Sequence, residues 1–569
     1  MKKMMKKNKK NNNSRPRLVL AVLMLGLSLA GFAGPARRGI VHRLQPDGST
    51  VQLRLTGDEF SHTYTTLDGT PVVEDENGFF RLRTELEGRE MQAARARRIQ
   101  ATRGGGIPDY RMSAFNARGN VHGVVLLVAY ADVAFSADSA TIHDTFANRF
   151  NGDNYTENFQ YSFYSNAAQM QIALSGTIPG SARDYFRDQS LGKFTPTFDV
   201  FGPITLDQNR AYYGGNDRGG SDVNAKGMVK DACLKAYESG LTDFSAYDND
   251  GDGYVDYVYV VYAGSDEAQF GSPDCIWAHS WNLSSPLVLG NQKIYKYACS
   301  GELYMDSSDA IQGIGTFVHE FSHVIGLPDF YNTQIDSPAE NDFCMDYWSI
   351  MDYGQYCKNG YCPAGYTSFE RYSMGWIPAH ELNSPDSITL QVTDDDPVMY
   401  RTFVNDNDTT AYYIFENIQR NGWGQGLPNY GLMITCVNYK ASAWTGNNVN
   451  ANKSRHRYHI VPANNEYSYE NENEQLYGRT NYEFTPESLP ASITCFGDTL
   501  FKPLTQITRT KNGPCTFNFM GGDNRIELQR NDFGEKRLYR INENIVIVQD
   551  DDKTYKILSR EKSSGELGF

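Results

Sequence analysis

The sequence predicts a mixed α+β/α/β fold, with β-rich regions on both sides of a central domain. Residues 40–92 alternate apolar and polar side chains between turn dipeptides, which is typical of short β-hairpins. From Val121 to about Pro378, helical and strand patterns alternate, and the continuous apolar run Gly123–Ala129 suits a buried central strand. Beyond Pro378, strand patterns dominate. Three regions of different architecture are therefore expected along the chain.

The length and composition suit several folded domains. The 569 residues are 40% hydrophobic and 13% aromatic, which is enough to fill more than one core. The formal net charge is −15 at pH 7, and such a surface repels nucleic-acid phosphates. We therefore expect no nucleic-acid partner, and the acidity is compatible with a protein that binds divalent cations.

Residues 1–33 have the pattern of a secretory signal peptide. A basic, Asn-rich start precedes the uncharged apolar run Leu18–Ala33, whose sixteen residues are short for a membrane span. Small residues at Gly31 and Ala33 predict cleavage after Ala33, although a retained membrane anchor is the alternative. We therefore predict a protein that is extracellular, or exported and surface-associated, with no membrane span in the mature chain.

The cysteines fit an oxidising compartment. Disulfides are permitted there, and a local Cys357–Cys362 bridge is expected, while the odd total leaves at least one thiol unpaired. None of them precedes Cys233, so a thiolate of the N-terminal region cannot block a metal site. The nine cysteines are Cys233, Cys275, Cys299, Cys344, Cys357, Cys362, Cys436, Cys495 and Cys515.

The pattern His319-Glu320-x-x-His323-x-x-Gly326-x-x-Asp329 predicts one catalytic zinc site. Positions i and i+4 share a helix face, so His319 and His323 can present imidazole nitrogens to one Zn²⁺. Glu320 lies beside the metal, where it can take a proton from a zinc-bound water. Gly326 allows a sharp turn after the helix, and Asp329 can then return as third ligand while a fourth position stays open.

Two further questions concern the same site. Glu340 or Glu370 would be the third ligand if the site resembled a different branch of zinc proteases, and Gly326 argues against this. Met351, in a Ser-Ile-Met-x-Tyr sequence, suits a tight turn whose methionine forms an apolar floor beneath the metal. Tyr353 is a candidate for stabilising the oxyanion of a tetrahedral intermediate.

An acidic loop predicts a second, structural cation. Carboxylates at alternate positions, a glycine and a following acid suit the many oxygen ligands of Ca²⁺. The loop departs from an EF-hand, because Tyr259 stands at the twelfth position and a strand follows; an acidic hairpin turn is the alternative. The expected ligands are Asp248, Asp250, Asp252, Asp256 and the backbone carbonyl of Tyr254.

The segment Gly315–Tyr331 resembles the immune inhibitor A type, or M6 family, of secreted bacterial metalloproteases. The similarity extends over roughly residues 40–522 and includes the segments Gly180–Phe186, Phe201–Pro203, Ile276–His279, Gly375–Trp376, Glu416–Asn417 and Phe519–Gly522. It implies a zincin (metzincin-like) catalytic domain, with His319, His323 and Asp329 as zinc ligands and Glu320 as general base. It also implies that the N-terminal hairpins are a propeptide.

The predicted organisation has five parts. A basic linker is expected from Arg95 to Gly106, with processing near Arg98 or Arg103 or elsewhere. The last part carries two apolar runs that suit a β-hairpin. The parts are a signal peptide (1–33), a propeptide-like β region and linker (34–110), the catalytic domain (116–385), a β-rich C-terminal region (386–522) and a short tail (523–569).

Together these patterns predict a secreted, monomeric zinc endopeptidase that is made as a zymogen and acts on protein or peptide substrates. Glu320 would activate a zinc-bound water for attack on the peptide carbonyl. Latency would rest on an oxygen ligand or on occlusion of the cleft, because the N-terminal region lacks cysteine. The alternative is a catalytically silent, calcium-stabilised exoprotein that acts as a binding or adhesive factor.

Overall fold

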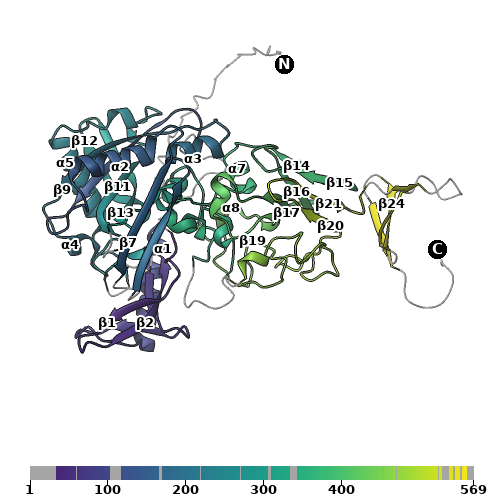
Figure 1. Cartoon of the computed structure of the whole chain (residues 1–569), viewed down its shortest axis with the longest axis horizontal. Helices are drawn as coiled ribbons and strands as arrows, with labels where there is room; N and C mark the ends of the chain where they lie inside the picture. The colour runs from purple at the N-terminus through teal and green to yellow at the C-terminus, as the bar shows by residue number, and fades with distance from the viewer. Residues whose placement is uncertain are drawn as a thin grey trace, which may run out of the picture.

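The computed structural model shows a mixed α/β protein with several separate sheets (Figure 1). A small N-terminal sheet and a β-rich C-terminal region both contact a central domain, and a further small sheet ends the chain. The predicted signal peptide lies outside the described residues. The structure describes residues 34–559 except 59–60, 103–116, 166–169, 218–219, 270, 306–308, 334–342, 453, 469–470, 523–524, 528–536, 543–544 and 552–553.

The N-terminal region forms the short hairpins that its turn dipeptides predict. Gly48, Gly69 and Gly78 have φ values of 83°, 87° and 84°, which only glycine adopts easily in such tight turns. Each pair of neighbouring strands is antiparallel, in the order β1-β2-β3-β4-β5. The strands are β1 (Val41–Leu44), β2 (Thr50–Asp58), β3 (Ser61–Thr65), β4 (Pro71–Glu74) and β5 (Phe80–Leu82).

The prediction of a linker from Arg95 to Gly106 is wrong for residues 95–102, because helix α1 spans Glu85–Thr102. Thr84 and Glu87 cap its start reciprocally, with N–H···O distances of 2.8 and 3.3 Å. Alanine, arginine, glutamine and glutamate, all good helix formers, then continue without proline. Arg95 is a buried partner of Asp58, at 2.5 and 2.6 Å, rather than a solvated hinge residue.

The central domain is built on one predominantly parallel sheet in the order β10-β13-β11-β6-β9, with β12 antiparallel to β13. Side chains of β6 alternate between two cores. Val125 and Leu127 face the core that includes α2 and α6, whereas Val124 and Leu126 face α5. The strands are β6 (His122–Ala129), β9 (Thr197–Thr205), β10 (Tyr254–Val255), β11 (Val258–Ser265), β12 (His279–Leu289) and β13 (Gln292–Leu303).

Helices cover both faces of this sheet, and an antiparallel ribbon lies beside it. The ribbon pairs β7 (Glu157–Ser165) with β8 (Met170–Ile178). The helices are α2 (Ser139–Asn151), α3 (Ala182–Gln189), α4 (Arg210–Gly214), α5 (Ala225–Glu238), α6 (Gly315–Val324) and α7 (Ser368–Ser373).

The C-terminal region is β-rich, as predicted, and shares its core with the central domain. Phe403, Tyr412 and Tyr458 belong to the same buried cluster as Phe317 of α6. Beyond it, residues 525–559 form an antiparallel sheet, β22-β23-β24-β25, that includes the expected hairpin. The remaining elements are β14 (Ala379–Glu381), β15 (Asp386–Leu390), β16 (Met399–Asn405), β17 (Asp408–Ile418), β18 (Gly431–Asn438), α8 (Ala441–Trp444), β19 (Tyr458–Ile460), β20 (Leu504–Arg509), β21 (Cys515–Phe519), β22 (Arg525–Glu527), β23 (Arg537–Asn542), β24 (Ile545–Asp551) and β25 (Thr554–Ser559).

The expectation of disulfides is wrong for this structure, in which all nine cysteines are free thiols. The expected Cys357–Cys362 bridge is not formed: the Cys357 thiol donates to the Tyr347 carbonyl at 3.8 Å, and the Cys362 thiol donates to that of Trp423 at 3.9 Å. Between them, Lys358 and Asn359 adopt left-handed backbone conformations, so the chain winds away from a direct link. Within the described ranges, no helix is long and apolar enough to cross a membrane.

Candidate metal centre

Helix α6 presents its two histidines on one side and anchors the other side in the core. Phe317 and Phe321, one turn apart, stack at 6.1 Å and both pack against Phe198 of β9. His319 and His323 occupy the same spacing on another face. Gly326, with φ of 108°, turns the chain directly after the helix, as its place in the motif predicts.

The structure brings His319, His323 and Asp329 together around one point. The Nε2 atoms of His319 and His323 are 3.2 Å apart. Asp329 Oδ1 lies 3.4 Å from Nε2 of His319 and 3.3 Å from Nε2 of His323. All three side chains are buried. Their ligand atoms lie within 4.8 Å of one another, a spacing suited to a shared metal ion.

Backbone carbonyls orient both imidazoles toward this point. His319 Nδ1 is 2.7 Å from the Ile350 carbonyl, and His323 Nδ1 is 2.8 Å from that of Leu327. A carbonyl only accepts, so Nδ1 carries the proton in each ring and Nε2 presents its lone pair inward. Burial lowers the pKa of His323, which favours the neutral, metal-binding form.

Asp329 is fixed by a residue from the C-terminal region. Its backbone N–H donates to Asn447 Oδ1 at 2.8 Å, and its Oδ2 accepts from Asn447 Nδ2 at 2.7 Å. Oδ1 is buried and has no hydrogen-bond donor among the described residues. Two inward lone pairs and this orphaned carboxylate oxygen fit a cation.

Glu320 lies next to the cluster and has a different environment. It is fully buried, its Oε1 accepts the Gly34 N–H at 3.2 Å, and its Oε2 has no partner within the described part of the chain. Burial, and then the charge of Asp329, raise the pKa of Glu320 well above its usual value. A carboxyl group in such surroundings suits proton transfer.

Met351 lies in a turn that is bonded to the ligand-bearing segments. Its carbonyl accepts the Phe330 N–H at 2.8 Å, and the carbonyl of the preceding residue is the His319 partner. The Met351 side chain is fully buried. The ring of Tyr353 instead packs 3.4 Å from the guanidinium of Arg38 and 6.1 Å from the ring of Tyr356. These contacts assign Tyr353 to the surroundings of Arg38 in this form of the protein.

One of the two rival third ligands, Glu370, does not join the cluster. Glu370 caps helix α7: one of its oxygens accepts the Thr367 N–H at 2.6 Å and the other accepts the Ser349 hydroxyl. Glu340 lies outside the described residues.

Residues 34–38 run through the site as an extended segment. The Gly34 carbonyl accepts from Trp277 Nε1 at 3.2 Å, and the Pro35 carbonyl accepts from the Tyr356 hydroxyl at 2.8 Å. Ala36 donates to the Gly57 carbonyl of β2 at 3.0 Å. The segment therefore covers Glu320, and a backbone N–H rather than an oxygen ligand faces the carboxylate.

Sequence reasoning missed the residues that shape the site from a distance, namely Asn447, Trp277, Tyr356 and Gln355. The Gln355 amide is buried against Gly34, and neither of its polar atoms has a hydrogen-bond partner in the described structure. None of the four belongs to a motif with fixed spacing from the histidines. Their roles depend on tertiary contacts, so no local pattern in the sequence indicates them.

The acidic loop brings together Asp248, Asp250 and Asp252 as a second group of carboxylates that could hold a cation. Asp248 accepts the backbone N–H groups of Asp252 and Gly253, each at 3.0 Å. Asp256 lies apart from this group: its Oδ2 accepts from Asn249, and burial raises its pKa. The Tyr254 N–H donates to Asp252 Oδ1 at 2.8 Å.

A helix that presents two imidazoles, a returning carboxylate and a second, buried carboxylate beside them is the arrangement of a metallopeptidase. Residues 116–377 match the family model described as Immune inhibitor A peptidase M6, catalytic domain. The predicted resemblance to the M6 family of metalloproteases is thereby confirmed over these residues.

Curated relatives carry names of the same kind. The chain is 28% identical over 250 residues to the Pre-pro-metalloprotease PrtV of Vibrio cholerae serotype O1. This match covers 38% of this chain and 27% of that protein. The chain is 27% identical over 256 residues to Immune inhibitor A of Bacillus thuringiensis subsp. alesti, which covers 41% of this chain and 36% of that protein. The chain thus matches about a quarter to a third of the length of these relatives.

A substitution of Asn447 tests whether its hydrogen bonds to Asp329 support metal binding. We expect Asn447→Gly, which keeps the left-handed backbone at φ of 51°, to weaken zinc binding at least tenfold because Asp329 loses both of its hydrogen bonds to the Asn447 amide. Competition with a chromophoric chelator measures the affinity. Asn465→Gly, at an exposed left-handed asparagine, is the matched control, and equal affinities in the two variants would contradict the assignment.

Proposed function

We propose that this protein is a secreted zinc-dependent endopeptidase, made as a zymogen and cleaving protein or peptide substrates. The observation that carries the proposal is the convergence of His319, His323 and Asp329 on one point, with the buried Glu320 beside them. The match to the M6 family model over residues 116–377 supports it. The names of the relatives, a metalloprotease among them, agree with it.

The chain's own residues divide the chemistry between them. A zinc ion in this site supplies Lewis acidity toward a peptide carbonyl and toward water. His319, His323 and Asp329 would hold it, and their carbonyl and amide partners fix them before substrate arrives. Glu320 takes the proton from the attacking water and then passes it to the leaving amine.

We infer a zincin (metzincin-like) arrangement for the catalytic domain. The supporting features are the parallel sheet with one antiparallel strand, helix α6 beneath it, and the buried turn of Met351 close to the ligands. Tyr353 can act as an oxyanion stabiliser after Arg38 has left its ring. In this interpretation, maturation completes the active site as well as uncovering it.

Latency then follows from occlusion by residues 34–38. If a signal peptidase cleaves after Ala33, Gly34 becomes the N-terminus, and its nitrogen lies 3.2 Å from Glu320 Oε1. The segment occupies the space that a substrate backbone needs beside the catalytic carboxylate. The N-terminal sheet holds the segment in place through the hydrogen bond between Ala36 and Gly57.

We also propose that Ca²⁺ braces the loop of Asp248, Asp250 and Asp252 at the start of the strands that lead into the sheet core. Three carboxylates close together repel one another, and a divalent cation removes that repulsion. The proposed role is structural.

Glu320→Gln tests the proton-transfer role. In protein activated by removal of the N-terminal region, we expect casein cleavage to fall by about a hundredfold to ten-thousandfold, with zinc content unchanged. Chelation should abolish the parent's activity, and added zinc should restore it. Zinc-loaded, activated parent protein that cleaves nothing would favour the alternative of a silent binding factor.

The position of the N-terminus tests latency. We compare recombinant chains that begin at Gly34 and at Ile40, since the second lacks only the segment that passes Glu320. The shorter chain should cleave casein at least about tenfold faster, because occlusion of a catalytic carboxylate removes substrate binding. Both chains should contain equal zinc. If the shorter chain stays equally latent, the β1–β5 sheet rather than the segment blocks the site.

Thermal unfolding with and without Ca²⁺ tests the loop. At a free concentration one hundred times the dissociation constant, binding stabilises the folded state by about 2.7 kcal/mol. We expect the calcium-dependent rise in Tm to disappear in Asp250→Asn and to remain in Asp243→Asn, an exposed acid in a nearby turn. All samples contain zinc, so the change reports on the loop. An identical rise in both variants would refute the assignment.

A further inference from the structure

The side chain of Arg38 occupies an acidic pocket near the metal centre. Its Nη1 lies 2.6 Å from Asp346 Oδ1, and its guanidinium carbon lies 3.4 Å from the ring centre of Tyr353 and 5.7 Å from that of Tyr347. Asp346 is fully buried, whereas Arg38 keeps 24% of its side-chain surface exposed. We call Asp346, Asp352, Tyr347, Tyr353 and Glu472 the Asp346 pocket.

The fold builds this pocket independently of Arg38. Asp346 has a left-handed backbone, φ of 53°, a conformation that aspartate adopts more often than most residues other than glycine. Asp352 holds that conformation, because its Oδ2 accepts the N–H groups of Met345 at 3.0 Å and Asp346 at 2.8 Å. The backbone at Asp346 is therefore held by a residue of the same segment and not by Arg38.

The pocket has more carboxyl groups than Arg38 pairs with. Asp346 Oδ2 and Asp352 Oδ1 are both buried and lack hydrogen-bond partners among the described residues. Burial and the charge of Asp346 raise the pKa of Asp352 and that of Glu472 to about 7, although Arg38 opposes both shifts. When residues 34–38 leave, Asp346 loses its ion pair with Arg38, and an unpaired carboxylate in such a site favours a new cation.

The path of the N-terminal segment connects the pocket to the reaction centre. Gly34 lies at Glu320, and the chain reaches Asp346 four residues later, at Arg38. Arg37, the residue before it, donates to the side-chain oxygens of Gln269 and Asn359 and lies 4.2 Å from the ring centre of Tyr304. Burial raises the pKa of Asp266 to about 6, and the charge of Arg37 opposes this shift, although no ion pair joins the two groups in the described structure. The adjacent side chains of Arg37 and Arg38 therefore differ in their direct partners: Arg37 donates to amide oxygens, and Arg38 pairs with a carboxylate.

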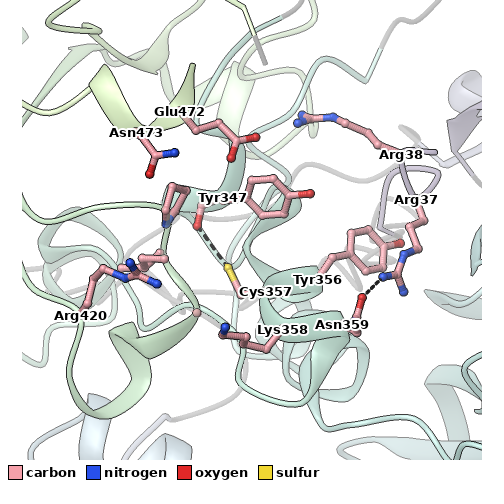
Figure 2. A pocket seen from close by; sticks show the side chains of 13 residues that line it. Arg37, Arg38, Tyr347, Tyr356, Cys357, Lys358, Asn359, Arg420, Glu472 and Asn473 are labelled. Atoms are coloured by element: carbon pink, nitrogen blue, oxygen red, sulfur yellow. Dashed lines mark hydrogen bonds between the residues drawn. The ribbon is translucent and has the colours of Figure 1, made fainter. Parts of the chain in front are cut away.

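The pocket also opens to solvent. A cavity of about 540 Å³ adjoins Arg38, and two pocket residues, Tyr347 and Glu472, belong to its lining. Lys358 and Arg420 also line this cavity, whereas Asp346 and Asp352 do not. Figure 2 shows the Arg38 guanidinium pointing across the ring of Tyr347 toward Glu472, at the edge of this cavity. A side chain that enters in place of Arg38 thus has room beside Glu472, and it reaches Asp346 along the path that Arg38 occupies. The pocket residues belong to the central domain and the C-terminal region, so they remain after the N-terminal region is removed.

We propose that the Asp346 pocket is a substrate subsite that binds a cationic side chain, preferably arginine, on the C-terminal side of the scissile bond. The cationic residue is expected four positions after the residue that takes the place of Gly34. Arginine is preferred over lysine because its planar group pairs with a carboxylate and stacks on the Tyr353 ring. The proposal rests on the endopeptidase function proposed above and specifies its substrate class.

The test uses activated protein from which the N-terminal fragment has been removed, and peptides with one fixed scissile bond. Arginine or its neutral isostere citrulline is placed in turn at each position after that bond, and kcat/KM is measured for each pair. We expect arginine to exceed citrulline about tenfold at the position equivalent to Arg38. At the position equivalent to Arg37, the ratio should be close to one.

Variants assign the preference to the pocket. Asp346→Asn removes the charge and tolerates the left-handed backbone, so the arginine-to-citrulline ratio should fall close to one. Asp207→Asn, which removes an acid from an exposed ion pair with Lys235, should keep the parent ratio. Glu472→Gln, at the pocket's partly exposed acid, should lower the ratio even if Asp346→Asn does not fold.

The outcomes separate the two proposals. Cleavage of every peptide with no arginine preference at any position would overturn the subsite and leave the endopeptidase intact. An effect of Asp346→Asn on zymogen latency alone would make the pocket an anchor for residues 34–38, and would equally overturn the subsite. If neither the peptides nor casein are cleaved by zinc-loaded protein, the proposed function fails, and the subsite fails with it.

Discussion

Three ligand atoms that repel one another lie buried at a single point, and the surrounding structure is arranged to keep them there. The Nε2 lone pairs of His319 and His323 face each other at 3.2 Å, with the carboxylate of Asp329 beside them. Without a cation, this geometry costs free energy, so it persists because backbone carbonyls and Asn447 hold each ligand from outside. The C-terminal region is therefore part of the metal centre, since it supplies Asn447.

The local parts of this arrangement could be predicted from the sequence. The i, i+4 histidines, the glycine after the helix and the returning aspartate lie within a span that one helix and one turn determine. The same holds for the hairpins at Gly48, Gly69 and Gly78, and for the buried strand β6. In each case, a short-range periodicity or a turn residue carries the information.

The parts that escaped prediction depend on contacts between distant segments. Asn447 is 118 residues from Asp329, and the Arg38–Asp346 pair joins residues 308 apart. Helix α1 was missed for a different reason, because a run of arginines resembles a solvated linker unless its tertiary partner is known. Asp58 is that partner for Arg95, and only the fold reveals it.

In the proposed zymogen, residues 34–38 link latency to substrate recognition. A segment that occludes an active site competes with substrates for the same groups, so its contacts report what those groups accept. Gly34 contacts Glu320, and Arg38 contacts Asp346. The distance between the reaction centre and the Asp346 pocket therefore corresponds to four residues of this segment. Asp346 is fully buried and would be left unpaired if the segment departs as proposed, so a cationic side chain of a substrate would restore the ion pair that Arg38 makes.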